Sequence, residues 1–250
     1  MRHRLDQLFD WLKLDSTTGQ EAAYLERLEA DLTQEGLTCQ RQPVAPGRWN
    51  LLASVDLQPP EVVLCTHVDT VPPYIAPTRH PDRIHGRGAC DTKGVLAAMV
   101  EAWSQLSSAE AARVGLLLVV GEEVDHIGAR EAERSVPWRP RRILLGEPTL
   151  CRVALAQKGG VSLRLTSEGV AGHSAFPEAG RSAIDPMVDA LAAIRKAVWP
   201  TDPQMGPTHV NIGELRGGVA PNIFAPSAQA HLFIRAVSPA DALVAQIEAL

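Results

Sequence analysis

The chain has 250 residues, of which 45% are hydrophobic and 21% charged, and its formal net charge is −5. This length and composition are typical of a globular protein with one large or two modest domains. The negative charge excludes the basic footprint of a nucleic-acid-binding protein, and the longest apolar run, residues 114–120, is far shorter than the roughly 20 residues that cross a membrane.

Two further features of the sequence bear on the cellular compartment. The basic start of the chain is interrupted by Asp6 and Asp10 before the apolar core of a signal peptide can form. The four cysteines are widely spaced and form no C-x-x-C pair, so neither a disulfide framework nor a zinc knuckle is suggested. We therefore expect a cytoplasmic protein with reduced thiols.

The first part of the chain has the pattern of an α/β domain. Apolar residues recur at helical spacing over residues 5–12 and 24–32, and Gly36 supplies a stop, so two amphipathic helices are predicted. Short apolar runs then alternate with helical patterns, which favours a sheet covered on both faces. Buried strands are expected at residues 50–55, 61–65, 114–120 and 143–145, with helices at residues 94–106 and 127–134.

The pattern changes near Lys158. A strand over residues 161–167 is followed by a helix over 182–198, strands over 209–215 and 229–237, and the start of another helix at Pro239. We interpret this as a separate α+β unit, with domain boundaries at 1–157 and 158–250. Because the sequence stops within the last predicted helix, we expect this second domain to be incomplete.

His67 opens a series of metal-ligand residue types at predicted strand ends. It follows the apolar run 62–65, and open α/β sheets build their sites where such strands end. Asp69 is placed to accept the second ring N–H of His67, which would fix the tautomer of a metal-ligating imidazole. Taken alone, a histidine at a strand end is more often structural.

Asp91 lies in the segment 86–94, directly before a predicted helix. A simple helix cap is the alternative explanation for an aspartate at this position. The glycines also suggest a phosphate loop, but Lys93 precedes Gly94, whereas the phosphate-loop pattern needs Gly-Lys followed by Ser or Thr. Nucleotide binding is therefore not expected.

Three glutamates follow two other predicted strands. Glu122 and Glu123 come after the strand 114–120, and adjacent carboxylates there are costly unless a cation compensates one of them. This favours one glutamate as a ligand and the other as a base, although a solvated acidic turn explains the pair equally well. Glu147 follows the strand 143–145, and Pro148 favours an extended backbone that would aim a ligand.

In this order, the four segments resemble the family of acetylornithine deacetylases, succinyl-diaminopimelate desuccinylases, aminoacylases and glutamate carboxypeptidases. The resemblance implies a zinc-exopeptidase-like catalytic domain, whose mixed sheet is sandwiched by helices, with an inserted α+β lid or dimerisation domain. It also implies two divalent metal ions. His67 and Glu147 would bind the first metal, Glu123 the second, and Asp91 would bridge both.

The same resemblance assigns catalytic roles. Glu122 would be the general base that activates water, with Asp69 as a second catalytic residue. The mixture of imidazole and carboxylate donors favours zinc, while cobalt and manganese fit the same set. The peptide bond between Asp91 and Thr92 is expected to be cis.

The second domain carries three candidates that match lid positions of the family. His173, in the segment 172–175, resembles the histidine that stabilises the oxyanion, generally in the active site of a partner subunit. Asn222 and Arg235 match positions that contact substrate, the arginine through a carboxylate. The resemblance therefore implies a homodimer formed through the lid. Gly121 departs from the pattern, because many relatives carry Asp there.

The expected activity is hydrolysis of the amide bond of an N-acyl amino acid, as in acetylornithine deacetylases of arginine biosynthesis or in desuccinylases. A carboxypeptidase or dipeptidase of the same family is the alternative within enzymes. Because the family's chains continue beyond the lid to a further histidine ligand, a truncated remnant that binds metal without turnover is the third hypothesis.

Overall fold

A computed structural model describes residues 2–250, and its elements fall into two units, Met1–Arg152 and Val153–Leu250. Each unit has its own hydrophobic core. The helices of the first unit are α1 (Arg2–Leu12), α2 (Ala22–Gln34), α3 (Lys93–Ser104), α4 (Ser108–Ala111) and α5 (Ile127–Ser135). Its strands are β1 (Thr38–Ala45), β2 (Arg48–Ser54), β3 (Val62–His67), β4 (Thr78–Arg79), β5 (Ile84–His85), β6 (Val114–Val119) and β7 (Arg142–Leu145).

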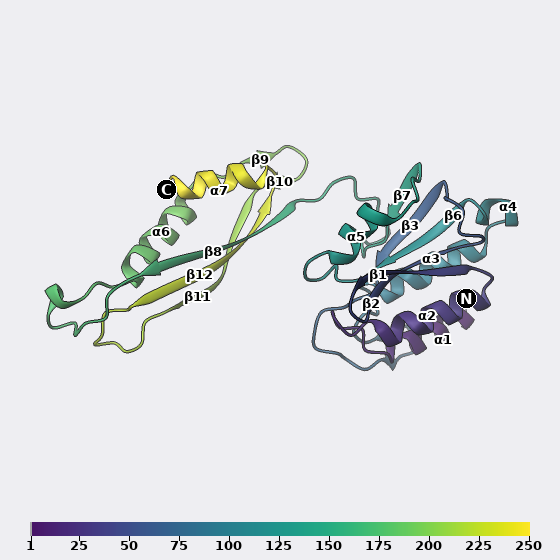
Figure 1. Cartoon of the computed structure of the whole chain (residues 1–250), viewed down its shortest axis with the longest axis horizontal. Coiled ribbons are helices and arrows are strands. Elements are labelled where there is room, and N and C mark those ends of the chain that lie inside the picture. Colours follow the sequence, from purple (N-terminus) through teal and green to yellow (C-terminus); the bar gives the residue numbers. More distant parts are fainter. Residues whose placement is uncertain (1) are drawn as a thin grey trace. The chain divides into compact units, whose positions relative to one another are not determined.

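A five-stranded mixed sheet in the order β1-β2-β6-β3-β7 organises this unit. The strands β6, β3 and β7 are parallel, whereas β2 is antiparallel to β6 and β1 is antiparallel to β2. The carboxyl ends of the three parallel strands therefore meet at one edge of the sheet. The predicted mixed sheet between helices is confirmed (Figure 1).

The apolar run in β6 is continuous because the strand is buried on both faces. Leu116 and Leu118 belong to the core that contains residues of α1, α2 and α3, while Val119 belongs to the core that contains residues of α5. Successive side chains of a strand point to opposite faces, so each face receives its own set of aliphatic residues. This arrangement holds the strand ends, and the loops that follow them, on a rigid base.

Asn50 of β2 is a fully buried polar side chain that joins several elements. Its Nδ2 donates to Gln42 Oε1 of β1 at 2.7 Å and to the backbone carbonyl of Gly128 in α5 at 2.8 Å. Its Oδ1 accepts the N–H of Val120 at 3.1 Å, directly after β6. A side chain at Gly128 would lie 2.5 Å from Asn50 Oδ1, so the glycine permits this approach.

Replacing Asn50 with Leu should destabilise the first unit by about 3–5 kcal/mol, because three buried polar groups lose their partner at about 1–3 kcal/mol each and only part of the cost is recovered by apolar packing. Urea unfolding followed by tryptophan fluorescence measures the change. Gln40→Leu, at an exposed position of β1, is the control. Equal destabilisation by the two substitutions would show that the buried amide adds no net stability.

Two strands differ from what the sequence predicts. The strand β1 was not predicted, because its sequence is polar, contains Pro43 and lies at an edge of the sheet. The residues Ile143, Leu144 and Leu145 do form a strand, β7, but they are 57%, 52% and 74% exposed rather than buried. Their exposure follows from the position of β7 at the opposite edge of the sheet.

The second unit packs helices on one face of a three-stranded antiparallel sheet in the order β11-β12-β8. Its core contains Met187, Leu191 and Ile194 of α6 together with Leu232 of β12. The elements of the unit are β8 (Gly159–Glu168), η1 (Pro177–Ala179), α6 (Ile184–Lys196), β9 (Thr201–Asp202), β10 (Gly206–Pro207), β11 (His209–Gly217), β12 (Ser227–Ala236) and α7 (Ala240–Glu248). The predicted α+β pattern agrees with these elements.

Candidate metal and active site

The candidate residues of the first unit gather at the carboxyl edge of the parallel strands. His67 is the last residue of β3, the turn that carries Glu122 and Glu123 follows β6, and Glu147 follows β7. Gly146 ties the end of β7 to β3: its N–H donates to the carbonyl of Cys65 at 2.8 Å, and its carbonyl accepts the hydroxyl of Thr66 at 2.8 Å. The loops that follow the neighbouring strands β6, β3 and β7 thus begin at the same edge of the sheet.

The tautomer of His67 is set by its own loop. The side chain is buried, and its Nδ1 donates to the backbone carbonyl of Asp69 at 2.9 Å. The carboxylate of Asp69 is 3.5 Å from Nδ1, so the expected hydrogen bond from the ring to this carboxylate is replaced by one to the backbone. Either hydrogen bond fixes the same tautomer, because a proton held at Nδ1 leaves Nε2 as the ligand atom.

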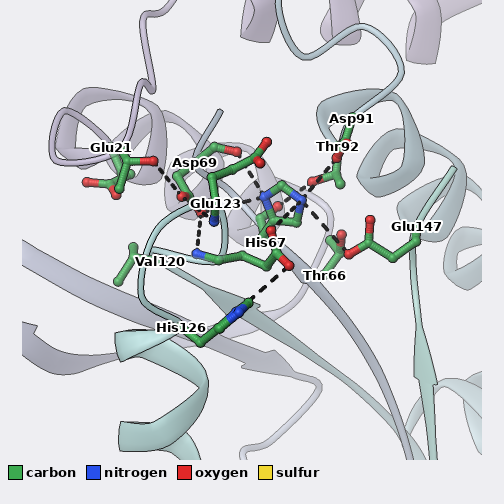
Figure 2. Close-up of polar contacts among 12 residues, drawn as sticks. Glu21, Thr66, His67, Asp69, Asp91, Thr92, Val120, Glu123, His126 and Glu147 are labelled. Atoms are coloured by element: carbon green, nitrogen blue, oxygen red, sulfur yellow. Dashed lines mark hydrogen bonds and ion pairs between the residues drawn. The ribbon is translucent and has the colours of Figure 1, made fainter. Parts of the chain in front are cut away.

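Carboxylates surround the Nε2 atom of His67. Asp91 Oδ1 lies 3.0 Å away, and Glu122 Oε2 and Glu147 Oε1 each lie 3.9 Å away. One donor atom each from His67, Asp91 and Glu123 lies within 4.8 Å of the others. Figure 2 shows Asp91 and Glu147 turned toward the ring of His67. The structure therefore brings together the four candidate ligands and Glu122.

The electrostatics of this cluster fit a cation. Burial lowers the pKa of His67, but the neighbouring carboxylates of Asp69, Glu147 and Glu122 outweigh it and raise that pKa to about 9. Burial, together with nearby carboxylates, also raises the pKa values of Glu123 and Glu147. The carboxylates favour a positive charge at the imidazole and repel one another. A divalent cation bound by these donors would supply the positive charge and reduce the repulsion among the carboxylates.

Asp91 does not act as a helix cap. The residue at the cap of α3 is Thr92, whose hydroxyl instead donates to the backbone carbonyl of His67 at 2.6 Å. The Asp91 carboxylate is therefore left free of the helix end and contacts the imidazole. The peptide bond between Asp91 and Thr92 is cis, as expected.

The carboxylate of Asp69 is a buried junction beneath the glutamate turn. It is 0% exposed, its Oδ1 accepts the N–H of Glu122 at 3.0 Å, and its Oδ2 accepts the N–H of Glu123 at 3.2 Å. The hydroxyl of Thr18 also donates to Oδ2, at 2.8 Å. Burial alone would raise the pKa of Asp69. The contacts with His67, Thr18 and Glu122 have the larger, opposite effect, so the pKa of Asp69 lies below its usual value. Asp69 thus holds the glutamate turn by its backbone.

Glu122 has a second neighbour that sequence reasoning missed. Nδ1 of His126 lies 3.8 Å from Glu122 Oε1, and Figure 2 shows this imidazole beside the cluster. The side chain of His126 is 57% exposed. Its backbone is left-handed, with φ of 55°, at the start of α5. The spacing of four residues from Glu122 was the available signal.

The three lid candidates lie in the second unit, and two of them are neighbours. The N–H of Ser174, next to His173, donates to the carbonyl of Asn222 at 3.0 Å, and His173 forms a β-bridge with Ile223. Nδ1 of His173 accepts the N–H of Ala175 at 3.1 Å. The His173 segment and the Asn222 segment are therefore fixed against each other.

Arg235 is separated from these two residues within its unit. It lies near the far end of β12, opposite His209, and its guanidinium stacks over the ring of Phe233 at 4.8 Å. The strand begins at Ser227, close to Asn222, and the eight steps from residue 227 to residue 235 span roughly 25 Å at the rise of an extended strand. The structure does not bring Arg235 together with His173.

Comparisons with known proteins bear on both units. Residues 155–250 match the family model M20_dimer, described as a peptidase dimerisation domain. The chain is 34% identical over 231 residues to a peptidase M20 domain-containing protein of Schizosaccharomyces pombe, a match that covers 90% of this chain and 58% of that protein. It is 32% identical over 237 residues to a "Probable carboxypeptidase" of Aspergillus oryzae, covering 86% of this chain and 55% of that protein.

A solved structure of a peptidase is also similar to this chain. A tripeptidase from Staphylococcus aureus is similar over 99% of this chain and 69% of its own, with a TM-score of 0.75 and 26% identity. The chain spans 55–60% of the length of the curated relatives that it matches. Within residues 2–250, none of the helices has the length and apolar character required for a membrane span.

Proposed function

Because the chain belongs to the M20 peptidase family, we propose that it acts as a metal-dependent hydrolase of an amide bond that precedes an amino acid with a free carboxylate. The observation that carries this proposal is the convergence of His67, Asp91, Glu123 and Glu147 on one edge of the sheet, with Glu122 beside them. Both a carboxypeptidase and an N-acyl amino acid deacetylase perform this reaction.

In the proposed site, His67, Asp91 and Glu147 would hold one divalent cation, and Asp91 and Glu123 would contribute to a second. The mixed imidazole and carboxylate donors favour zinc, and cobalt or manganese suit the same set. When bound, the cations polarise the scissile carbonyl and lower the pKa of water. The crowded carboxylates described above support a site for more than one positive charge.

Glu122 is the proposed base. Its carboxylate is 38% exposed, so it can reach a water molecule, and its backbone N–H is held by Asp69. It takes a proton from the attacking water and returns it to the nitrogen of the leaving amine, which then departs as a neutral amino group. Glu122 is suited to the role of base because its carboxylate lies beside the proposed metal ligands and its backbone is held by Asp69.

The second unit supports a homodimer in this proposal. We assign His173 to stabilisation of the oxyanion, and Asn222 and Arg235 to substrate contact, the arginine through the free carboxylate. Because Arg235 lies roughly 25 Å along β12 from Ser227, and the β12 end at Ser227 is the one that follows the paired His173 and Asn222 segments, a substrate the size of an amino acid derivative is not expected to touch both His173 and Arg235 in one copy. The two residues would therefore act at one site only if they come from different subunits, which agrees with the match to a dimerisation domain.

The finer choice of substrate is tested with a panel. The zinc-loaded chain is incubated with N-acetylornithine, N-succinyl-diaminopimelate, an N-blocked dipeptide, a free dipeptide, and versions of the first three with the carboxylate amidated. Cleavage is expected for substrates with a free carboxylate and lost on amidation.

The pattern of cleavage separates the hypotheses. Selective hydrolysis of N-acetylornithine favours the deacetylase predicted from the sequence, and hydrolysis of the blocked dipeptide favours a carboxypeptidase. Cleavage of the free dipeptide alone favours a dipeptidase. Zinc binding without cleavage of any member would overturn the proposed hydrolysis by this chain and favour the remnant hypothesis.

A further inference from the structure

A single hydroxyl from the N-terminal loop completes the set of donors to the Asp69 carboxylate. Thr18 Oγ1 donates to Oδ2 of Asp69 at 2.8 Å, which is shorter than the 3.2 Å hydrogen bond from the Glu123 N–H to the same oxygen. The other oxygen, Oδ1, accepts the Glu122 N–H at 3.0 Å. A charged oxygen that is fully buried needs such donors, and the hydroxyl is the closest of the three.

The backbone around Thr18 holds the hydroxyl in place. The N–H of Thr18 donates to the carbonyl of Thr70 at 3.1 Å, and the N–H of Thr70 donates to the carbonyl of Ser16 at 3.0 Å. Thr17 and Thr70 accordingly form a parallel β-bridge. Gly19, whose φ of 95° is left-handed, then turns the chain away toward α2. The loop is therefore paired with the segment directly after Asp69.

We propose that Thr18 is a positioning residue of the proposed reaction, since its hydroxyl fixes the orientation in which the Asp69 carboxylate accepts the N–H groups of Glu122 and Glu123. The inference rests on the proposed function, in which these glutamates serve as base and ligand. Without the hydroxyl, Oδ2 keeps only the longer hydrogen bond and the carboxylate is free to turn. The backbone of the glutamate turn would then shift away from the imidazole of His67.

The size of the expected effect follows from how such supporting groups act elsewhere. Outer partners of metal ligands typically contribute about 10–100-fold to metal affinity or activity. A displacement of about 1 Å at reacting groups costs on the order of 100-fold in rate. Because Thr18 acts on both glutamates, loss of its hydroxyl should weaken zinc binding and lower kcat together, with little change in KM.

The test compares three variants of the whole chain. Thr18→Val replaces the hydroxyl with a methyl group of similar size, and Thr18→Ser keeps the hydroxyl. Thr17→Val is the matched control, because the neighbouring Thr17 hydroxyl donates to Asp15 at 2.7 Å rather than to Asp69. Zinc affinity is measured by competition with a chromophoric chelator, kcat and KM on a cleaved member of the panel, and folding by thermal melting.

We expect Thr18→Val to lower zinc affinity and kcat by about 10–100-fold, while Thr18→Ser and Thr17→Val stay within about threefold of the parent chain. Parental zinc affinity and kcat in Thr18→Val would overturn the inference. So would equal losses in Thr17→Val, or a loss in Thr18→Val that appears only as a lower melting temperature. If the parent chain binds zinc but cleaves nothing, the proposed function fails, and zinc affinity alone still decides the role of Thr18.

Discussion

Replacing Glu122 with Gln is expected to lower kcat by about 10²–10⁴-fold, the usual contribution of a general base, while zinc content stays unchanged. The amide has nearly the shape of the carboxylate but cannot take a proton from water. The backbone N–H of residue 122 would still be held by Asp69. Steady-state kinetics and metal analysis of the same preparation provide the two readings.

Two neighbours of Glu122 serve as controls. Glu123→Gln should lose zinc as well as activity, because Glu123 is a proposed ligand within the donor cluster. Asp125→Asn, in the same turn, should change neither, because its Oδ1 accepts the N–H of Ile127 and the amide oxygen can do the same. Near-parental kcat in Glu122→Gln would remove Glu122 from the role of base.

Replacing His67 with Ala is expected to weaken zinc binding by more than about 100-fold, since removal of a ligand costs more than loss of an outer partner. Nε2 of His67 is the atom that faces Asp91, Glu122 and Glu147. In the parent chain, zinc at 100 times its Kd should stabilise the folded state by about 2.7 kcal/mol. Thermal melting should therefore show a rise of several degrees with zinc. At the same zinc concentration His67→Ala should show only a small fraction of that rise, because zinc at or below its Kd stabilises the folded state by at most about 0.4 kcal/mol.

His85→Ala is the control for this experiment, because His85 is an exposed histidine of β5 in the same unit. Its melting temperature should respond to zinc like that of the parent chain. If His67→Ala keeps the full response to zinc, the cation is bound by donors other than this cluster. A loss of the response in His85→Ala would lead to the same conclusion.

The strongly periodic parts of the fold were predictable from the sequence. The helix α2 and the strands β3 and β6 carry patterns that tertiary structure reinforces, because their predicted apolar residues pack into a core. In α1 the prediction holds for Leu8 and Leu12, whereas Leu5 is 46% exposed. The strand β1 has no such pattern, since its side chains are largely exposed and it is defined by its hydrogen bonds to β2. The exposure of β7 depends on its place at the sheet edge, which local sequence does not encode.

The candidate ligands were predictable because each follows a strand whose end the sequence marks. The hydrogen bonds that position these ligands were harder to predict from the sequence. Asp69 was assigned to the ring of His67, yet its carboxylate accepts the N–H groups of the glutamate turn. Thr18 lies 51 residues from Asp69 along the chain and belongs to no recognised motif. Contacts between a loop and a distant strand end arise only when the fold is formed.

The division of the chain into two units has a consequence for how such proteins diverge. Every candidate cation donor belongs to the first unit, and every candidate for substrate selection belongs to the second. If the proposed roles hold, mutations at positions such as Asn222 and Arg235 of the second unit can alter substrate preference without disturbing the cation donors or the base Glu122. New specificities would then evolve on an inherited hydrolytic centre, consistent with relatives that are named for different peptidase activities.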